Sequence, residues 1–132
     1  MSFKLIRLAK DWLGRTKPIE AKPEDEAKFL LKYKNLSVGT LSVKIGVWTF
    51  AYSEEFKNQD QLRPILELPD VKTIYQSPDL WQFFAMRIPS LEQPAIGEIL
   101  KNEHIKEDDA VKLLKRFGKR TIANPFDLQN VP

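Results

Sequence analysis

The chain contains 132 residues, a length that suits one domain with a single hydrophobic core. Its composition of 42% hydrophobic and 30% charged residues is that of a globular protein and excludes a disordered or fibrous one. The net charge is +3, and the absence of cysteine excludes disulfide frameworks, thiolate metal sites and cysteine nucleophiles. No apolar run approaches the roughly 20 residues of a membrane-spanning helix, so we expect a soluble cytoplasmic protein that does not bind a membrane.

The first segment, residues 3–13, has apolar side chains at helical spacing on one face and cations on the other. Residues 14–26 contain two prolines and clustered charges, which indicate an exposed connection. The sequence therefore predicts an N-terminal amphipathic helix with a charged linker over residues 1–26, followed by a folded domain over residues 27–132.

Short apolar segments begin the domain. FLLKY (29–33), VGTLSVK (38–44) and VWTFAY (47–52) are separated by two-residue turn signals and predict three strands of an antiparallel meander. Trp48, Phe50 and Tyr52 alternate with smaller residues, so we expect all three on the core face of the sheet. LRPILEL (62–68) predicts a fourth extended segment, at an edge because it contains proline.

Helical signals follow Pro69. Ser77 and Pro78 predict the start of a helix over residues 79–88, and further helices are expected over 93–103 and 107–117. The predicted fold is therefore α+β, with a small antiparallel sheet followed by and packed against three short helices.

Catalytic patterns are not evident. The five glycines are too dispersed for a phosphate-binding loop or a dinucleotide-binding motif. His104 is the single histidine, and a metal site built on it and the carboxylates at 107–109 is not favoured. We expect no enzymatic activity, no cofactor and no metal.

The segment YQSPDLWQFFAMRIP (75–89) is dense in aromatic residues. On a helix, Trp81, Phe84 and Ile88 share one stripe and Arg87 lies on the adjoining one. So wide an apolar arc predicts a partner-binding surface, to which we add Tyr75, because tryptophan and arginine are common interface anchors. The alternative is that both stripes belong to the core.

A basic run, KLLKRFGKR, covers residues 112–120. Lys115, Arg116, Lys119 and Arg120 are candidates for phosphate contact, although cations are also common in the last turn of a helix. Direct contact with nucleic acid is therefore a less favoured expectation.

The order of these motifs resembles the N-terminal subdomain of the HipA-like serine/threonine kinase toxins. The resemblance rests on four runs, which together span about residues 36–128: VGTLSVKIGVWTFAYSEEF, LRPILELP, YQSPDLWQFFAMRIPS and ANPFDL. In that family a kinase core follows, whereas this sequence ends at Pro132. The resemblance thus implies a stand-alone subdomain similar to the HipS proteins of three-component HipBST systems.

What the resemblance implies is a non-catalytic antitoxin-like protein that binds and neutralises a HipA-like (HipT-like) kinase. A HipB-like helix-turn-helix DNA-binding protein is a further implied partner. Two alternatives stay open: a DNA-associated regulator that uses a basic helix, and a structural adaptor that shares only the fold.

Overall fold

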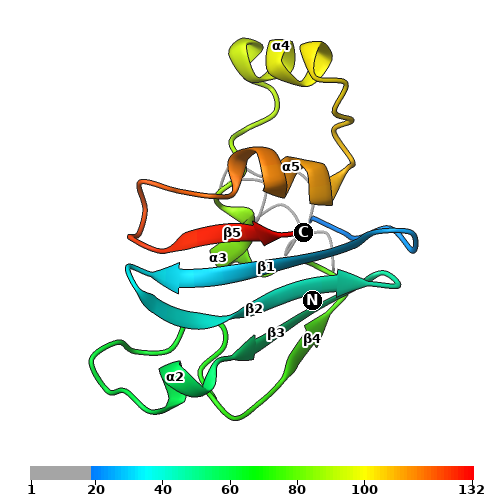
Figure 1. Cartoon of the computed structure of the whole chain (residues 1–132). Helices are drawn as coiled ribbons and strands as arrows, with labels where there is room; N and C mark the ends of the chain where they lie inside the picture. The colour runs from blue at the N-terminus through cyan, green and yellow to red at the C-terminus, as the bar shows by residue number, and fades with distance from the viewer. Residues whose placement is uncertain (1–18) are drawn as a thin grey trace, which may run out of the picture.

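The computed structural model describes residues 19–132, so the amphipathic helix predicted over 3–13 lies outside the described residues. A five-stranded antiparallel sheet with the order β4-β3-β2-β1-β5 forms one layer, and helices cover one of its faces (Figure 1). The predicted α+β class with an antiparallel sheet is confirmed. The strands are β1 (Glu26–Tyr33), β2 (Leu36–Lys44), β3 (Val47–Tyr52), β4 (Tyr75–Ser77) and β5 (Asp127–Val131).

The three predicted meander strands are all present. β1 and β2 are joined by Lys34-Asn35, and β2 and β3 by Ile45-Gly46, where both residues have positive φ. Glycine tolerates that conformation, which explains Gly46 in this two-residue turn. In β2, Gly39 is needed for another reason: a Cβ atom there would lie only 2.5 Å from the ring of Phe50.

The two edge strands differ from expectation. Residues 62–68 form a loop instead of a strand, and the edge beside β3 is the short β4. The opposite edge is β5, which comes after the helices in the chain and pairs with β1. The sheet therefore does not simply precede the helices, because its last strand returns from the end of the chain to the β1 edge.

Four helices lie in the described part of the chain: α2 (Glu54–Lys57), α3 (Gln82–Ala85), α4 (Pro94–Asn102) and α5 (Ala110–Phe117). The predicted helix over 79–88 is reduced to the single turn of α3. Ser77 does not cap it, because its hydroxyl accepts a hydrogen bond from Asp79 N in the preceding turn. The helix predicted over 107–117 is present as α5 but begins three residues later, with Asp109 as its N-cap accepting from Lys112 N at 3.1 Å.

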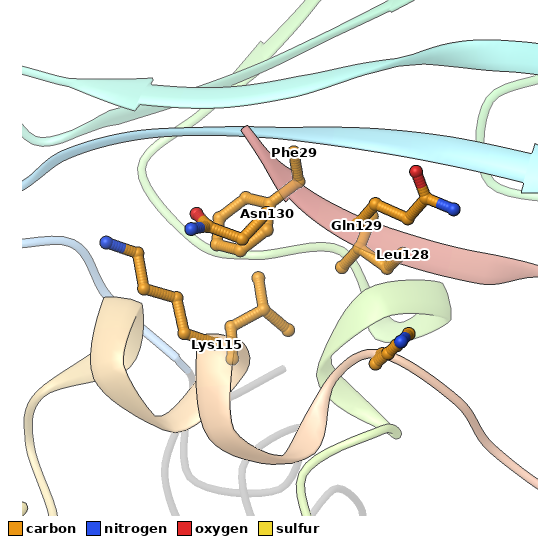
Figure 2. A pocket seen from close by; sticks show the side chains of 7 residues that line it. Phe29, Lys115, Leu128, Gln129 and Asn130 are labelled. Atoms are coloured by element: carbon orange, nitrogen blue, oxygen red, sulfur yellow. The ribbon is translucent and has the colours of Figure 1, made fainter. Parts of the chain in front are cut away.

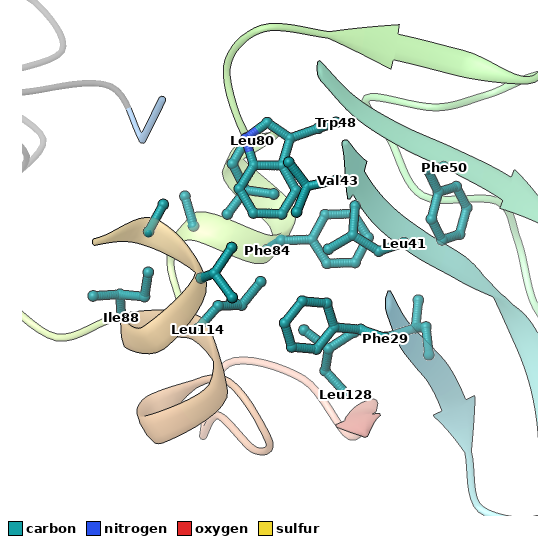
Figure 3. Close-up of a cluster of buried hydrophobic side chains, with 14 of the residues drawn as sticks. Phe29, Leu41, Val43, Trp48, Phe50, Leu80, Phe84, Ile88, Leu114 and Leu128 are labelled. Carbon is teal, nitrogen blue, oxygen red and sulfur yellow. The ribbon is translucent and has the colours of Figure 1, made fainter. Parts of the chain in front are cut away.

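The core lies between one face of the sheet and the helices α3 and α5 (Figure 3). Trp48, Phe50 and Tyr52 are buried, as their alternation predicted. Phe84 from α3 and Leu114 from α5 meet them from the helix side. The opposite face of the sheet carries half-buried Thr40, Ser42 and Thr49 among its side chains, as is usual for an antiparallel sheet that faces water on one side.

The linker before β1 is attached to the domain. Ile19 packs against the core, and its carbonyl oxygen accepts a hydrogen bond from Leu80 N at 2.8 Å. Lys22 forms an ion pair of 3.2 Å with Asp108, beside the start of α5. From residue 19 onward, the expected exposed connection therefore lies along the domain surface.

Candidate protein-binding surface

The aromatic segment around α3 contributes mainly to the core. Phe84 is 0% exposed, and its ring centroid lies 5.5 Å from that of Phe50 in β3. Ile88 is also buried. A helical layer of so few residues has to cover a five-stranded sheet, and for that reason Phe84 and Ile88 turn inward.

Arg87 is buried as well, with only 4% of its surface exposed. Its guanidinium donates hydrogen bonds to Gly118 O at 3.0 Å, to Lys119 O at 3.3 Å and to Asn124 Oδ1 at 3.1 Å. Burial lowers the pKa of Arg87 to about 10, so the group is a cation at pH 7. Its charge stabilises the carbonyl groups that follow α5, where the helix dipole is negative.

The five predicted partner-binding residues consequently do not form one exposed surface. Phe84, Arg87 and Ile88 are buried within the domain, whereas Trp81 and Tyr75 are half-buried and retain accessible surface. The indole of Trp81 lies against the Phe84 ring, with 6.4 Å between centroids. Of the predicted set, Trp81 and Tyr75 keep surface that a partner could contact.

Hydrogen bonds from two tyrosine side chains hold the loop over residues 65–75. The buried Tyr52 hydroxyl donates to Leu68 O at 2.6 Å and accepts from Ile65 N at 2.9 Å. Burial raises the pKa of Tyr52 to about 12, so this hydroxyl keeps its proton through the neutral range. The hydroxyl of Tyr75 accepts from Asp70 N at 2.7 Å, which closes the other end of the loop.

Glu67 connects this loop to α3. Its carboxylate accepts hydrogen bonds from Gln82 N at 3.1 Å and Phe83 N at 2.7 Å, so it caps the helix in place of a local serine. Because Leu66 precedes Glu67 and Trp81 precedes Gln82, this contact brings the Leu66 backbone to the start of α3. The loop and Trp81 thus form one continuous structural unit.

Two large apolar side chains project from the anchored loop. Leu66 is 94% exposed and Ile74 is 66% exposed. We call Leu66, Ile74, Tyr75 and Trp81 the loop–Trp81 surface. Sequence reasoning missed Leu66 because residues 62–68 were predicted as an extended segment, and it had no signal for Ile74. Pro64 and Pro69, which flank Leu66, were the available signal of an irregular loop. An exposed leucine held on a fixed backbone is well suited to protein contact.

The four predicted phosphate-contacting residues are all exposed, but they fall into two pairs. Arg116 forms an ion pair with Glu103 at 2.8 Å, and Arg120 lies 3.5 Å from Asp127. Lys115 and Lys119 have no ion pair within residues 19–132 and line a groove beside β5. Half of the positive charge expected for phosphate contact is thus already balanced.

Three further features of the described residues concern metal ligands, the histidine and the length of the helices. No group of three or more metal-ligating side chains occurs within residues 19–132. His104 is exposed, in a turn with a φ of 57°. No helix between residues 19 and 132 is long and apolar enough to span a membrane.

Comparison with known protein families identifies the family to which this domain belongs. The family described as HipA N-terminal domain matches residues 29–123, from β1 to the loop that precedes β5. The chain belongs to the HipA N-terminal domain family. This match confirms the resemblance drawn from the four sequence runs, and the HipA N-terminal domain is a non-catalytic subdomain. Comparison with curated proteins gave no match.

The matched range includes the loop–Trp81 surface and all four helices. β5, which forms one wall of the groove lined by Lys115 and Lys119, follows the matched range.

Proposed function

We propose that this protein is a non-catalytic, HipS-like antitoxin that binds and neutralises a HipA-type serine/threonine kinase toxin. The observation that carries the proposal is the family match over residues 29–123, which covers most of the described domain. These 132 residues contain the HipA N-terminal domain and no glycine-rich phosphate-binding loop. A HipA N-terminal domain is suited to occupy the place of that subdomain on a kinase that lacks it.

The loop–Trp81 surface is the contact that we propose for the kinase. Leu66 and Ile74 are exposed, and Trp81 combines a half-buried ring with the high contact energy typical of tryptophan at interfaces. The hydrogen bonds of Tyr52, Glu67 and Tyr75 fix the loop before binding, so little conformational entropy is lost on association. This surface replaces the set that contained Phe84, Arg87 and Ile88.

A HipB-like helix-turn-helix protein is proposed as a third component, which would connect the complex to DNA in the cytoplasm. Direct DNA binding by this chain is the alternative, and Lys115 and Lys119 favour it because their charges are unbalanced among the described residues. A DNA affinity that falls steeply with salt for the isolated protein would support that alternative, and no binding at about 50 mM salt would oppose it.

The proposal is tested by purifying the tagged protein from its own cells and identifying what accompanies it by mass spectrometry. We expect a HipA-type kinase near a 1:1 ratio, and we expect its phosphorylation activity to fall as purified antitoxin is added back. Recovery without any kinase would overturn the proposed partner. A bound kinase that stays fully active would overturn neutralisation and leave an adaptor function.

Two variants locate the contact. Leu66→Asp places a charge on the most exposed apolar side chain of the loop–Trp81 surface and should abolish recovery of the kinase. Ile45→Asp is the matched control, since Ile45 is 73% exposed and lies in the turn at the other end of β3, about 20 Å away along the strand. Loss of the kinase with both variants, or with neither, would contradict the assigned surface.

A further inference from the structure

A groove of about 250 Å³ lies between α5 and β5 (Figure 2). Its floor is formed by Phe29, Leu114 and Leu128, whose side chains close the core at this edge of the sheet. Gln129 and Asn130 line the wall formed by β5. The groove is separate from the loop–Trp81 surface and takes no part in the proposed kinase contact.

The rim of the groove is positive. Lys115 and Lys119 both line it, Lys115 within α5 and Lys119 just after the end of that helix. The neighbouring cations Arg116 and Arg120 form ion pairs with Glu103 and Asp127. Within residues 19–132, three cations of the basic run have no ion pair, Lys112, Lys115 and Lys119, and the last two line the groove.

The outer edge of β5 has backbone groups that point away from the sheet, which is a second, independent feature of the groove. Leu128 N donates to Lys119 O at 2.9 Å, so the peptide groups of Leu128 point away from the partner strand β1. Backbone groups alternate in direction along an antiparallel strand, which means that Asn130 also points its N–H and C=O outward. Beyond the contact with Lys119, no described residue pairs with this outer edge.

We propose that this groove binds an extended acidic segment of a partner protein, which adds a short strand to the free edge of β5. The backbone of the segment bonds to the outward groups of Asn130 and to the carbonyl of Leu128. Acidic side chains at alternate positions of the segment, about 7 Å apart along one face of the added strand, meet Lys115 and Lys119 at the rim of the groove.

The charges of the chain favour this occupant. The chain's own residues 1–18 carry five cations and one anion, so the lysines of the groove repel them. Nucleic acid would engage more cations than the two that line the groove, and it would leave the backbone groups of Asn130 without partners. An acidic peptide satisfies both the lysines and the strand edge.

The test uses the full chain and a fluorescein-labelled peptide, Gly-Ser-Glu-Val-Glu-Val-Glu-Ser-Gly. We expect saturable binding that weakens as salt rises, and at least about tenfold weaker binding to a K115E/K119E double variant. A K101E/K106E double variant changes the net charge equally at exposed lysines outside the groove and should bind within about twofold of the wild type. Equal loss in both variants would show an effect of net charge alone and would overturn the site.

Hydrogen exchange then tests the strand addition. The amide of Asn130 should exchange at least about tenfold more slowly with peptide bound, whereas that of Gln129, which faces β1, should change little. The same peptide with lysine in place of glutamate should give no protection. The proposal is overturned if Asn130 stays unprotected at saturation, if an oligonucleotide displaces the peptide and protects the same amide, or if the chain pairs with itself through β5.

Discussion

The segment around α3 and the loop over residues 65–75 use similar side chains for opposite purposes. Around α3, Phe84, Arg87 and Ile88 are buried, although tryptophan, phenylalanine and arginine together have the composition of an interface. In the loop, Leu66 and Ile74 are exposed on a backbone held by Tyr52 and Glu67. Composition therefore does not distinguish a core segment from a binding surface in a domain this small; the anchoring contacts do.

Substitutions in the two regions should therefore affect different free energies, that of unfolding and that of partner binding. Substitutions around α3 should act mainly on the free energy of unfolding, because they remove core contacts and buried hydrogen bonds. Substitutions of the exposed loop residues should act mainly on partner affinity, since those side chains contact little of their own domain. The following predictions test this separation, from the largest expected effect to the smallest.

Phe84→Ala should give the largest loss of stability. The ring is fully buried between the sheet and the helices, so its removal should lower the free energy of unfolding by about 3–5 kcal/mol. Urea denaturation measures the change, with Ile74→Ala as the control, because that exposed side chain should alter stability by no more than about 0.5 kcal/mol. Equal effects at the two positions would contradict the assignment of Phe84 to the core.

Arg87→Met keeps much of the buried volume but removes the charge. Three acceptors, Gly118 O, Lys119 O and Asn124 Oδ1, would lose their donor, and we expect a loss of about 3 kcal/mol in urea denaturation. A variant as stable as the wild type would show that this network does not hold α3 to the end of α5.

Tyr52→Phe tests the anchor of the loop. The variant leaves Leu68 O and Ile65 N without their buried partner, so the free energy of unfolding should fall by about 1–2 kcal/mol near pH 7. The effect should also depend on pH. Burial raises the pKa of Tyr52 from 10.0 to about 12, so this contribution to stability is fully present below pH 10 and is lost as the pH rises toward 12.

Urea titrations of the wild type and the Tyr52→Phe variant at pH 8 and pH 11 check this sign. The wild type should lose more stability between the two values than the variant does. A steeper loss in the variant would mean that Tyr52 is not the group whose ionisation weakens the fold in this range.

Glu67→Ala should have the smallest effect on folding. The variant removes the carboxylate that caps α3, for which we expect a loss of about 1 kcal/mol in urea denaturation. It also releases the Leu66 backbone from the start of α3, so affinity for the kinase should fall more than stability does. Unchanged affinity would show that the cap does not organise the binding surface.

Much of the fold could be predicted because it depends on local patterns. The alternation of Trp48, Phe50 and Tyr52 correctly indicated a strand with one buried face, and the helix predicted over 107–117 is present as α5. β5 was missed because its polar sequence DLQNV has no such pattern, and only its pairing with β1 makes it a strand. α3 proved shorter than predicted, and its cap comes from Glu67, 15 residues before Gln82.

The candidate site was predictable only in part. Trp81 and Tyr75 could be selected from their residue types, and both retain accessible surface. The exposure of Leu66 depends on where Tyr52 and Glu67 hold the loop, which are contacts between distant parts of the chain. The division of the basic run likewise depends on Glu103 and Asp127, which approach Arg116 and Arg120 only after folding.

The central claim is that the loop–Trp81 surface binds the kinase while the residues around α3 hold the fold. It is tested most directly by calorimetric titration of the co-purifying kinase with the wild type and with Trp81→Ala. We predict that the substitution weakens binding by about 2 kcal/mol, roughly 30-fold in Kd, while the far-ultraviolet circular dichroism stays that of a folded domain. Unchanged affinity in a folded variant, or an unfolded variant, would contradict the account.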